Sequence, residues 1–171
     1  RNSMIEELIS DNDSGRMPGH TKRIGRELAM LYLFSGELNK DHLTVERSEF
    51  YAEAANLLKW RENRQLRKGR EYADELLDLY VLHGPDVDER IKRQSRNWEW
   101  DRISLVDKNI MRIAVCEMLY MGEVPPVVSI NEAVEIAMDY SGEHSGNFIN
   151  GVLNAVKDQL SRPAREAVDN L

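Results

Sequence analysis

The segment from Leu105 to Met121 constrains the fold most strongly, because apolar residues occupy almost every face of the helix it would form. Ser104 and Asp107 have the spacing of a capping box, which predicts that this helix begins there. A helix that is apolar all round must be enclosed by other helices, so we expect it to be central. Unpaired charges would be costly in that position, and we expect Asp107, Arg112 and Glu117 to be paired or capping.

The rest of the chain has the same helical periodicity. From about His20 onward, apolar residues recur at intervals of three and four, and no stretch alternates strictly as a half-buried strand does. We therefore predict an all-α fold of about seven helices in one domain over residues 20–161. The predicted helices run from Thr21 to about Gly36 and over about 44–59, 72–82, 86–96, 105–121, 130–140 and 145–160, and a basic stretch over 59–70 leads into the third of them.

Turn and cap residues set several of the predicted boundaries. Gly69 is predicted to mark a break or bend, and His83-Gly84-Pro85 to end a helix. Ser129 and Glu132 form a full capping box, which predicts a helix start at Ile130. Residues 1–19 are polar and turn-rich, so we expect a mostly disordered leader, with a frayed turn at 4–9, that is dispensable for folding, and residues 162–171 are predicted to form a tail.

Charge is distributed unevenly along the chain. Residues 21–70 carry 11 Lys and Arg against 7 Asp and Glu, whereas residues 71–171 carry 10 against 19, and the net charge of the chain is -7. The positive charge is densest from Lys59 to Arg70. This asymmetry suits a molecule with one face for a polyanion and another for a different partner, although solvated helix surfaces also produce it.

The sequence lacks the motifs of several enzyme and metal-binding classes. Cys116 is the only cysteine, which excludes an internal disulfide and any multi-cysteine metal site. The four histidines lie far apart, and neither a nucleophile motif nor a glycine-rich phosphate loop occurs. We therefore expect no enzymatic activity, no cofactor and no metal.

Charged residues also interrupt every apolar stretch well before the roughly 18 residues that a membrane span needs. No stretch has the character of a secretory signal. We expect a cytoplasmic protein that does not interact with membranes.

Lys22, Arg23 and Arg26 form the first candidate binding site. They share one edge near the N-terminus of the first predicted helix, where the helix dipole and free N–H groups favour a phosphate. Surface helices commonly carry three cations, so this spacing alone is only suggestive of nucleic-acid binding.

Three ordered sequence blocks carry a family resemblance. They are W-x3-R-I-x2-V-D-x2-I-M-R-I-A-x2-E-M at 98–118, P-P-x-V-x-I-N-E-A-V-E-I-A at 125–137 and F-I-N-G-V-L-N at 148–154. With their spacings, these blocks resemble the NusB transcription antitermination factor family, and the resemblance covers about residues 20–160. It implies an all-helical fold of two packed bundles, over about 20–83 and 84–161.

The resemblance also implies a function. Family members are non-enzymatic proteins that bind the boxA element of ribosomal RNA leader transcripts together with NusE, a small-subunit ribosomal protein. The pair joins RNA polymerase with other Nus factors and suppresses premature termination of ribosomal RNA transcription. Because ribosomal proteins are typically cationic, the acidic second half of this chain suits a docking surface for NusE.

The family's arginine-rich RNA-binding helix maps onto residues 22–27, which assigns RNA contacts to Lys22, Arg23 and Arg26. Ile24 and Gly25 depart from the family pattern and are expected to weaken RNA binding. Phe34 lacks the hydroxyl of the family's aromatic residue but can still stack on a base. We hypothesise that Arg64, Arg67 and Lys68 compensate for this weakened RNA binding by the first helix.

Phe148 and Asn150 lie in the family block near which the RNA surface continues. For Phe148, an ordinary core position is an equal alternative. Asn150 either touches RNA or bonds a neighbouring backbone group, and Gly151 is expected to permit close helix approach.

Two other functions remain open at this point. A NusB-like module for protein interaction or dimerisation could have weakened or lost RNA binding, and a homodimer is possible. Because NusB-like domains also occur fused to RNA methyltransferases, an enzymatic role would require that this chain be a piece of a larger protein.

Overall fold

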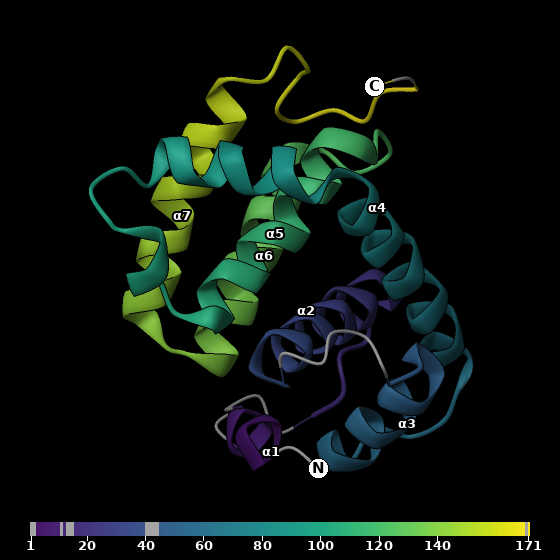
Figure 1. Cartoon of the computed structure of the whole chain (residues 1–171). Helices are drawn as coiled ribbons and strands as arrows, with labels where there is room; N and C mark the ends of the chain where they lie inside the picture. The colour runs from purple at the N-terminus through teal and green to yellow at the C-terminus, as the bar shows by residue number, and fades with distance from the viewer. Residues whose placement is uncertain (1–2, 11, 13–15, 40–44, 170) are drawn as a thin grey trace.

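The computed structural model of the chain describes residues 3–10, 12, 16–39, 45–169 and 171. Within these residues there are seven α-helices and no strand, which confirms the predicted all-α fold (Figure 1). The helices are α1 Ser3–Ser10, α2 Thr21–Asn39, α3 Arg47–Leu58, α4 Arg64–Gln94, α5 Leu105–Tyr120, α6 Pro126–Tyr140 and α7 Glu143–Asp158, with a 3₁₀ turn at Trp100–Arg102. None of the described helices combines the length and apolar character needed to cross a bilayer.

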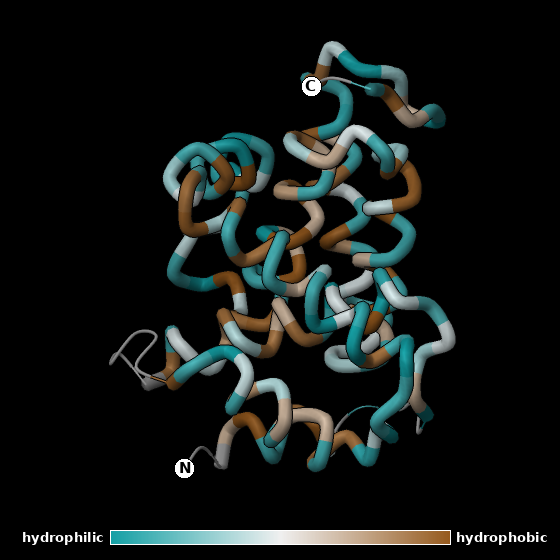
Figure 2. Tube along the Cα trace, turned by 90° about the vertical axis from the view of Figure 1, so that its right-hand side faces the viewer, coloured by the Kyte–Doolittle hydropathy of each residue, from teal (hydrophilic) through white to brown (hydrophobic). Residues whose placement is uncertain are grey.

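Helix α5 lies at the centre and packs against α2, α4, α6 and α7. Every residue from Asp107 to Met118 is buried, as the apolar sequence predicted. The Ser104 hydroxyl accepts a hydrogen bond from the Asp107 N–H at 3.1 Å, which confirms the predicted cap. Along the other helices apolar and polar stretches alternate, the pattern of helices that bury one face (Figure 2).

Helix α4 is longer than the sequence indicated. It continues through Gly84 and Pro85 to Gln94, so the predicted helix end at His83-Gly84-Pro85 is wrong. An internal proline removes one backbone hydrogen bond and bends a helix, and contacts of α4 with α2, α5 and α7 hold both of its halves in place. Figure 1 shows α4 changing direction part-way along, from the right-hand edge of the view to the top. The division into two bundles remains a proposal, with its boundary inside this helix.

Two glycines determine how closely α2 and α4 cross. A Cβ atom at Gly25 would lie 2.8 Å from the carbonyl oxygen of Gly69, and a Cβ at Gly69 would overlap the side chain of Ile24. The prediction of a break or bend at Gly69 is therefore wrong, because this glycine serves the close approach of two helices. Gly151 was expected to have that role, but a Cβ there would meet no atom within 4 Å.

The predicted capping box at Ser129 is also wrong, because α6 begins at Pro126 and Ser129 lies inside the helix. Proline is favoured in the first turn of a helix, where its missing N–H is not needed. The buried Ser129 hydroxyl instead donates a hydrogen bond to Glu117 Oε1 at 2.7 Å.

The N-terminal segment is more ordered than expected. Residues 3–10 form α1, which buries Ile5, Leu8 and Ile9 and packs against α2 and α3. The prediction of a mostly disordered leader over 1–19 is wrong for these residues, because their apolar side chains recur at helical spacing. Residues 1–2, 11 and 13–15 of that leader, and the predicted helix start at Thr44, lie outside the described residues.

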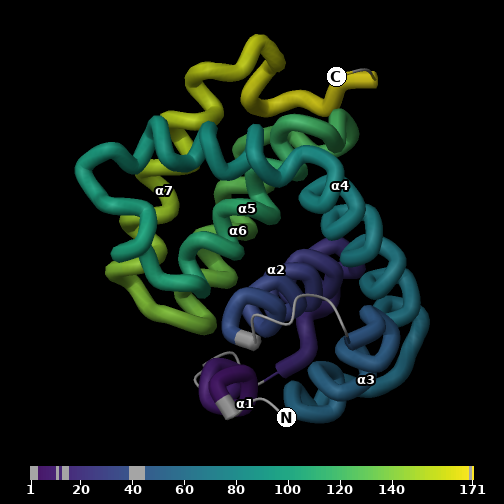
Figure 3. The backbone as a smooth tube through the Cα atoms, viewed as in Figure 1, coloured from purple at the N-terminus to yellow at the C-terminus, as the bar shows by residue number. Residues whose placement is uncertain are grey.

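The C-terminal segment folds back onto the turn between α5 and α6. The Arg162 guanidinium donates hydrogen bonds to the carbonyl oxygens of Met118 at 3.0 Å and Val124 at 2.9 Å. The Val168 N–H donates to the Gly122 carbonyl oxygen at 2.7 Å. This segment lies at the opposite end of the molecule from α1 (Figure 3).

Candidate nucleic-acid interface

An open groove lies between the first turn of α2, the first half of α4 and the start of α6. Lys22 of α2 and Lys68 of α4 line it, and both side chains are exposed. The Lys22 ammonium lies 5.8 Å from the centre of the Tyr72 ring, within cation–π range. Two residues that the sequence assigned to RNA binding therefore share one surface, because α2 and α4 cross closely at Gly25 and Gly69.

The first turn of α4 adds further cations beside this groove. The Asn63 side chain caps the helix by accepting a hydrogen bond from the Leu66 N–H at 2.8 Å. Arg64, Arg67 and Lys68 follow and are all exposed, with Arg64 and Lys68 one turn apart on the same face. The three residues of the compensation hypothesis thus lie together on the outside of the molecule.

Arg23, by contrast, is half-buried among carboxylates of α6. Its Nε and Nη2 donate hydrogen bonds to the two carboxylate oxygens of Glu132, at 3.0 and 3.1 Å. Nη2 also lies 3.1 Å from Glu135 Oε2, and Nη1 lies 4.0 Å from Asp139 Oδ2. Burial opposes the charge on Glu132, but the hydrogen bond and charge of Arg23 and the charge of Arg26 outweigh it and lower the pKa of Glu132.

Arg26 lies deeper, and only 4% of its surface is exposed. Its Nε donates to Glu117 Oε2 at 2.7 Å and its Nη1 to Glu132 Oε1 at 2.8 Å. The predicted contact between Arg26 and RNA does not fit this position, because its guanidinium is enclosed and joins three helices. The sequence could not reveal this pairing, since Glu117 is distant along the chain.

Glu117 is fully buried at the centre of this network, and its ion pair with Arg26 confirms the expectation that this charge on α5 is paired. Besides Arg26, it accepts hydrogen bonds from the hydroxyls of Tyr72 and Ser129. Burial, together with the nearby Glu117 charge, raises the pKa of the Tyr72 hydroxyl far above its usual value. Tyr72 is therefore a neutral donor that links α4 to α5 and also lines the groove.

Glu27 is a second buried carboxyl that the sequence did not single out. The Tyr140 hydroxyl donates a hydrogen bond to Glu27 Oε1 at 2.8 Å. Burial raises the pKa of Glu27 to about 7, although this hydrogen bond and the charge of Arg23 act in the opposite direction. This carboxyl therefore titrates near neutral pH, and its protonation is linked to the stability of the fold.

The two predicted aromatic contacts differ in exposure. Phe34 is only 5% exposed and belongs to the apolar core, so its ring cannot stack on a base in this conformation. Phe148 is half-buried against the core, and its ring packs edge-on against Trp98, with ring centres 5.7 Å apart. Trp98 itself is 53% exposed, and the sequence offered a signal for it, since it opens the first block of the family resemblance.

Asn150 is exposed on α7 and accepts a hydrogen bond from Asn154 Nδ2 at 3.1 Å on its side-chain oxygen. Helix α7 lies on the other side of α5 and α6 from α3 and the first half of α4 (Figure 1). The structure therefore brings together Lys22, Arg64, Arg67 and Lys68, and it places Phe148 and Asn150 on a different part of the surface. No group of three His, Cys, Asp or Glu residues that could hold a metal occurs in the described part of the chain.

Comparisons with known proteins agree with this architecture. The model of the NusB family matches residues 23–158. The transcription antitermination proteins NusB of Chloroherpeton thalassium and Bacillus mycoides are 35% and 38% identical over 142 and 143 residues, which cover 82% and 81% of this chain. The chain spans 63% of the length of the first relative and 98% of the second.

Solved structures show the same fold. T. maritima NusB superposes with a TM-score of 0.67 at 27% identity, covering 86% of this chain and 95% of that one. A chain from a crystal structure of the antitermination factors NusB and NusE in complex with double-stranded RNA gives a TM-score of 0.65 at 24% identity, covering 82% of this chain and 98% of that one.

Proposed function

Because the chain belongs to the NusB family, we propose that it is a transcription antitermination factor that binds boxA RNA of ribosomal RNA leaders. It does so together with NusE and promotes processive ribosomal RNA transcription as part of the RNA polymerase antitermination complex. A NusB protein of this fold has been solved with NusE and double-stranded RNA, which supports both partners. The proposed role is that of a cytoplasmic, non-catalytic adaptor.

The exposed cations beside the α2–α4 groove carry this proposal. Lys22 and Lys68 line the groove together with Glu71, Glu75 and Glu132, and Arg64 and Arg67 add two exposed cations on the first turn of α4. Phosphates that bind there release condensed counterions, which supplies most of the sequence-independent affinity for RNA. The N-terminus of α2 opens toward the same groove, and its dipole favours a bound phosphate.

Arg23 can contribute to RNA binding only if a phosphate replaces one of its carboxylate partners. Its guanidinium is held by Glu132, while Glu135, whose side chain is 64% exposed, competes for Nη2. An RNA phosphate that approaches from solvent can replace Glu135 without breaking the bidentate contact with Glu132. Arg23 therefore contributes to RNA binding less than a free arginine would.

A second function is favoured by a specific observation. Arg26 and Phe34, two of the residues assigned to RNA, are buried in the fold. A NusB-like module for protein interaction or dimerisation would need neither residue at its surface. The two functions differ in whether RNA affinity depends on the cations of α4.

Charge reversal at the first turn of α4 tests the proposal. The triple variant R64E/R67E/K68E is compared with K92E/R93E/R96E, a matched control of equal charge change near the end of the same helix. We expect the first variant to lower the affinity for boxA RNA at least about 10-fold and to reduce the slope of log affinity against log salt by up to about 2. Equal effects of the two variants, or none, would favour the protein-interaction module.

A further inference from the structure

The α2–α4 groove contains several polar side chains that are free to bind a ligand. They are exposed, and within the described part of the chain none of them forms a side-chain hydrogen bond or an ion pair: Lys22, Gln65, Lys68, Glu71 and Glu75. The groove has a volume of about 750 Å³, within the range of about 300–1,000 Å³ that is typical of ligand pockets. It therefore has room for a nucleotide-sized group and offers that group both donors and acceptors.

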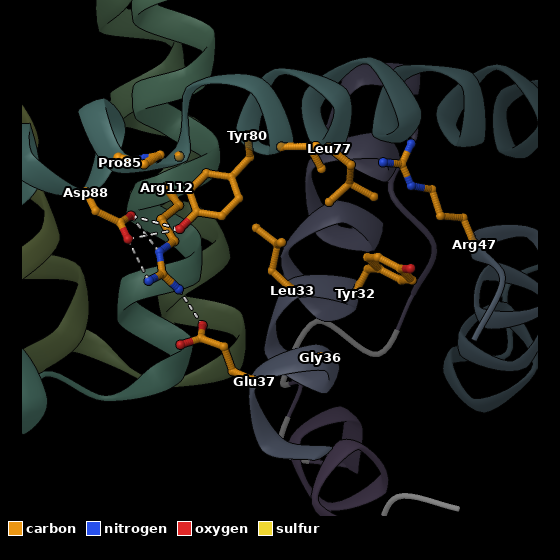
Figure 4. Close-up of a pocket in the computed structure, with 12 residues that line it drawn as sticks. Tyr32, Leu33, Gly36, Glu37, Arg47, Leu77, Tyr80, Pro85, Asp88 and Arg112 are labelled. Atoms are coloured by element: carbon orange, nitrogen blue, oxygen red, sulfur yellow. Dashed lines mark hydrogen bonds and ion pairs between the residues drawn. The ribbon is translucent and has the colours of Figure 1, made fainter. Parts of the chain in front are cut away.

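A second groove, between α2, α3 and α4, shows the opposite arrangement (Figure 4). Every described charged side chain that lines it is paired, Arg112 with Asp88 and Glu37, and Arg47 with Asp78. Polar groups that already satisfy one another gain little from a polar ligand. The unpaired groups of the α2–α4 groove therefore favour it as the site for such a ligand.

The α2–α4 groove presents charges of both signs. Lys68, Glu71 and Glu75 are three and four residues apart, so they follow one another along one face of α4. Lys22 adds a second cation from the first turn of α2. A cationic peptide would be repelled by the two lysines, and a chain of phosphates alone would be repelled by the two glutamates. The arrangement fits a ligand that carries both an anionic group and hydrogen-bond donors.

An unpaired guanosine nucleotide of RNA has this combination of groups. Its phosphate is an anion, and its Watson–Crick edge presents the O6 acceptor beside the N1–H and N2–H donors. The two adjacent donors match the two oxygens of a carboxylate, and O6 matches a lysine ammonium. Among the four bases of RNA, only guanine has two adjacent donors beside an acceptor on this edge, so a carboxylate next to a lysine selects guanine.

We propose that the α2–α4 groove selects an unpaired guanine of the bound RNA. A carboxylate of Glu71 or Glu75 accepts the N1–H and N2–H bonds, and Lys68 donates to O6. Val128 of α6, which lines the groove and is 40% exposed, contacts the face of the base, while Lys22 binds the phosphate. The inference rests on the proposed function and adds sequence selection to it, because phosphate contacts position RNA whereas base contacts specify it.

A competition experiment with inosine tests this selection. Inosine differs from guanosine only in lacking the N2 amino group, so it loses one of the two donors. Short oligouridines that carry one central guanosine or one central inosine displace labelled boxA RNA from the wild-type chain. We expect the guanosine oligomer to compete at least about 5-fold better than the inosine oligomer. This ratio should be the same at two salt concentrations, because both oligomers release the same counterions.

Two matched variants assign the contact to the groove. E71Q/E75Q removes both free carboxylates, and E49Q/E53Q makes the same change at the same spacing on exposed positions of α3. We expect the preference for guanosine to fall below about 2-fold in E71Q/E75Q and to keep its wild-type value in E49Q/E53Q. Thermal unfolding confirms that both variants are folded.

Three results would overturn the guanine contact. Carboxylates that only repel the RNA backbone would let E71Q/E75Q bind both oligomers more tightly by the same factor, with the guanosine preference unchanged. Equal competition by the two oligomers on the wild-type chain, or none by either, would also overturn the contact and leave the proposed function intact. Failure of the wild-type chain to bind boxA RNA would instead refute the proposed function and this inference together.

Discussion

Replacement of Arg26 by methionine tests whether this arginine supports the fold or contacts RNA. In the wild type, the Arg26 guanidinium lies 2.7 Å from a carboxylate oxygen of the fully buried Glu117. R26M keeps most of the side-chain volume but leaves the Glu117 charge with only the hydroxyls of Tyr72 and Ser129 as partners. The variant therefore isolates the energetic consequence of the buried ion pair.

The magnitude follows from the burial of both partners. Removal of one member of a buried ion pair costs about 3–5 kcal/mol of unfolding free energy, because the other charge stays buried and uncompensated. The two remaining hydroxyl donors place the expected loss near the lower end, about 3 kcal/mol. For a chain of this size that loss corresponds to a decrease of roughly 6–12 °C in Tm.

Urea and thermal unfolding of four proteins provide the assay. R26M is compared with the wild type, with R67M, which changes an exposed arginine, and with R26M/E117Q, which removes the stranded charge. We expect R67M to stay within about 0.5 kcal/mol of the wild type and R26M/E117Q to be more stable than R26M. A wild-type stability of R26M, or no recovery on adding E117Q, would refute the assignment of Arg26 to the core of the fold.

Three further predictions concern the same helices. The pKa of Glu27 is raised from 4.5 to about 7 in the folded state, so its stabilising contribution is complete below pH 4.5 and is lost as pH rises through 7. E27Q should therefore raise the unfolding free energy at pH 8 by up to about 3 kcal/mol but not at pH 4, and urea titrations at both pH values check this. G25A should lower the unfolding free energy by about 1–3 kcal/mol in thermal unfolding, since the new methyl would lie 2.8 Å from the Gly69 oxygen. A gain in stability would contradict the close crossing of α2 and α4 at these two glycines. E135Q should raise boxA affinity a few-fold by releasing one competitor for Arg23, and an unchanged affinity in RNA titration would exclude that competition.

The sequence alone was sufficient to predict the fold class and the central helix. The apolar character of 105–121 identified α5, and the blocks of the family resemblance supplied the architecture. The helix boundaries failed where tertiary contacts override local signals: α4 continues through Pro85, and α6 begins before Ser129. The apolar spacing within 3–10 was present in the sequence, but the surrounding turn residues obscured it.

The candidate site was predicted less completely, because ion pairs between distant segments cannot be derived from spacing. Lys22 and Arg26 are one turn apart on α2, yet one faces solvent and the other reaches Glu117 across the interior. The role of Gly25 was also hidden, since its importance depends on Gly69 in another helix. Tyr72 could have been found, because it follows Lys68 by one helical turn and shares its face.

The most direct test of the proposed function is a titration of the wild-type chain against boxA RNA and a scrambled RNA, with and without NusE, at two salt concentrations. The account predicts tighter binding to boxA than to the scrambled RNA, a further gain on adding NusE, and affinity that falls steeply with salt. Equal, weak and salt-insensitive binding to both RNAs would contradict the account and leave a protein-interaction module.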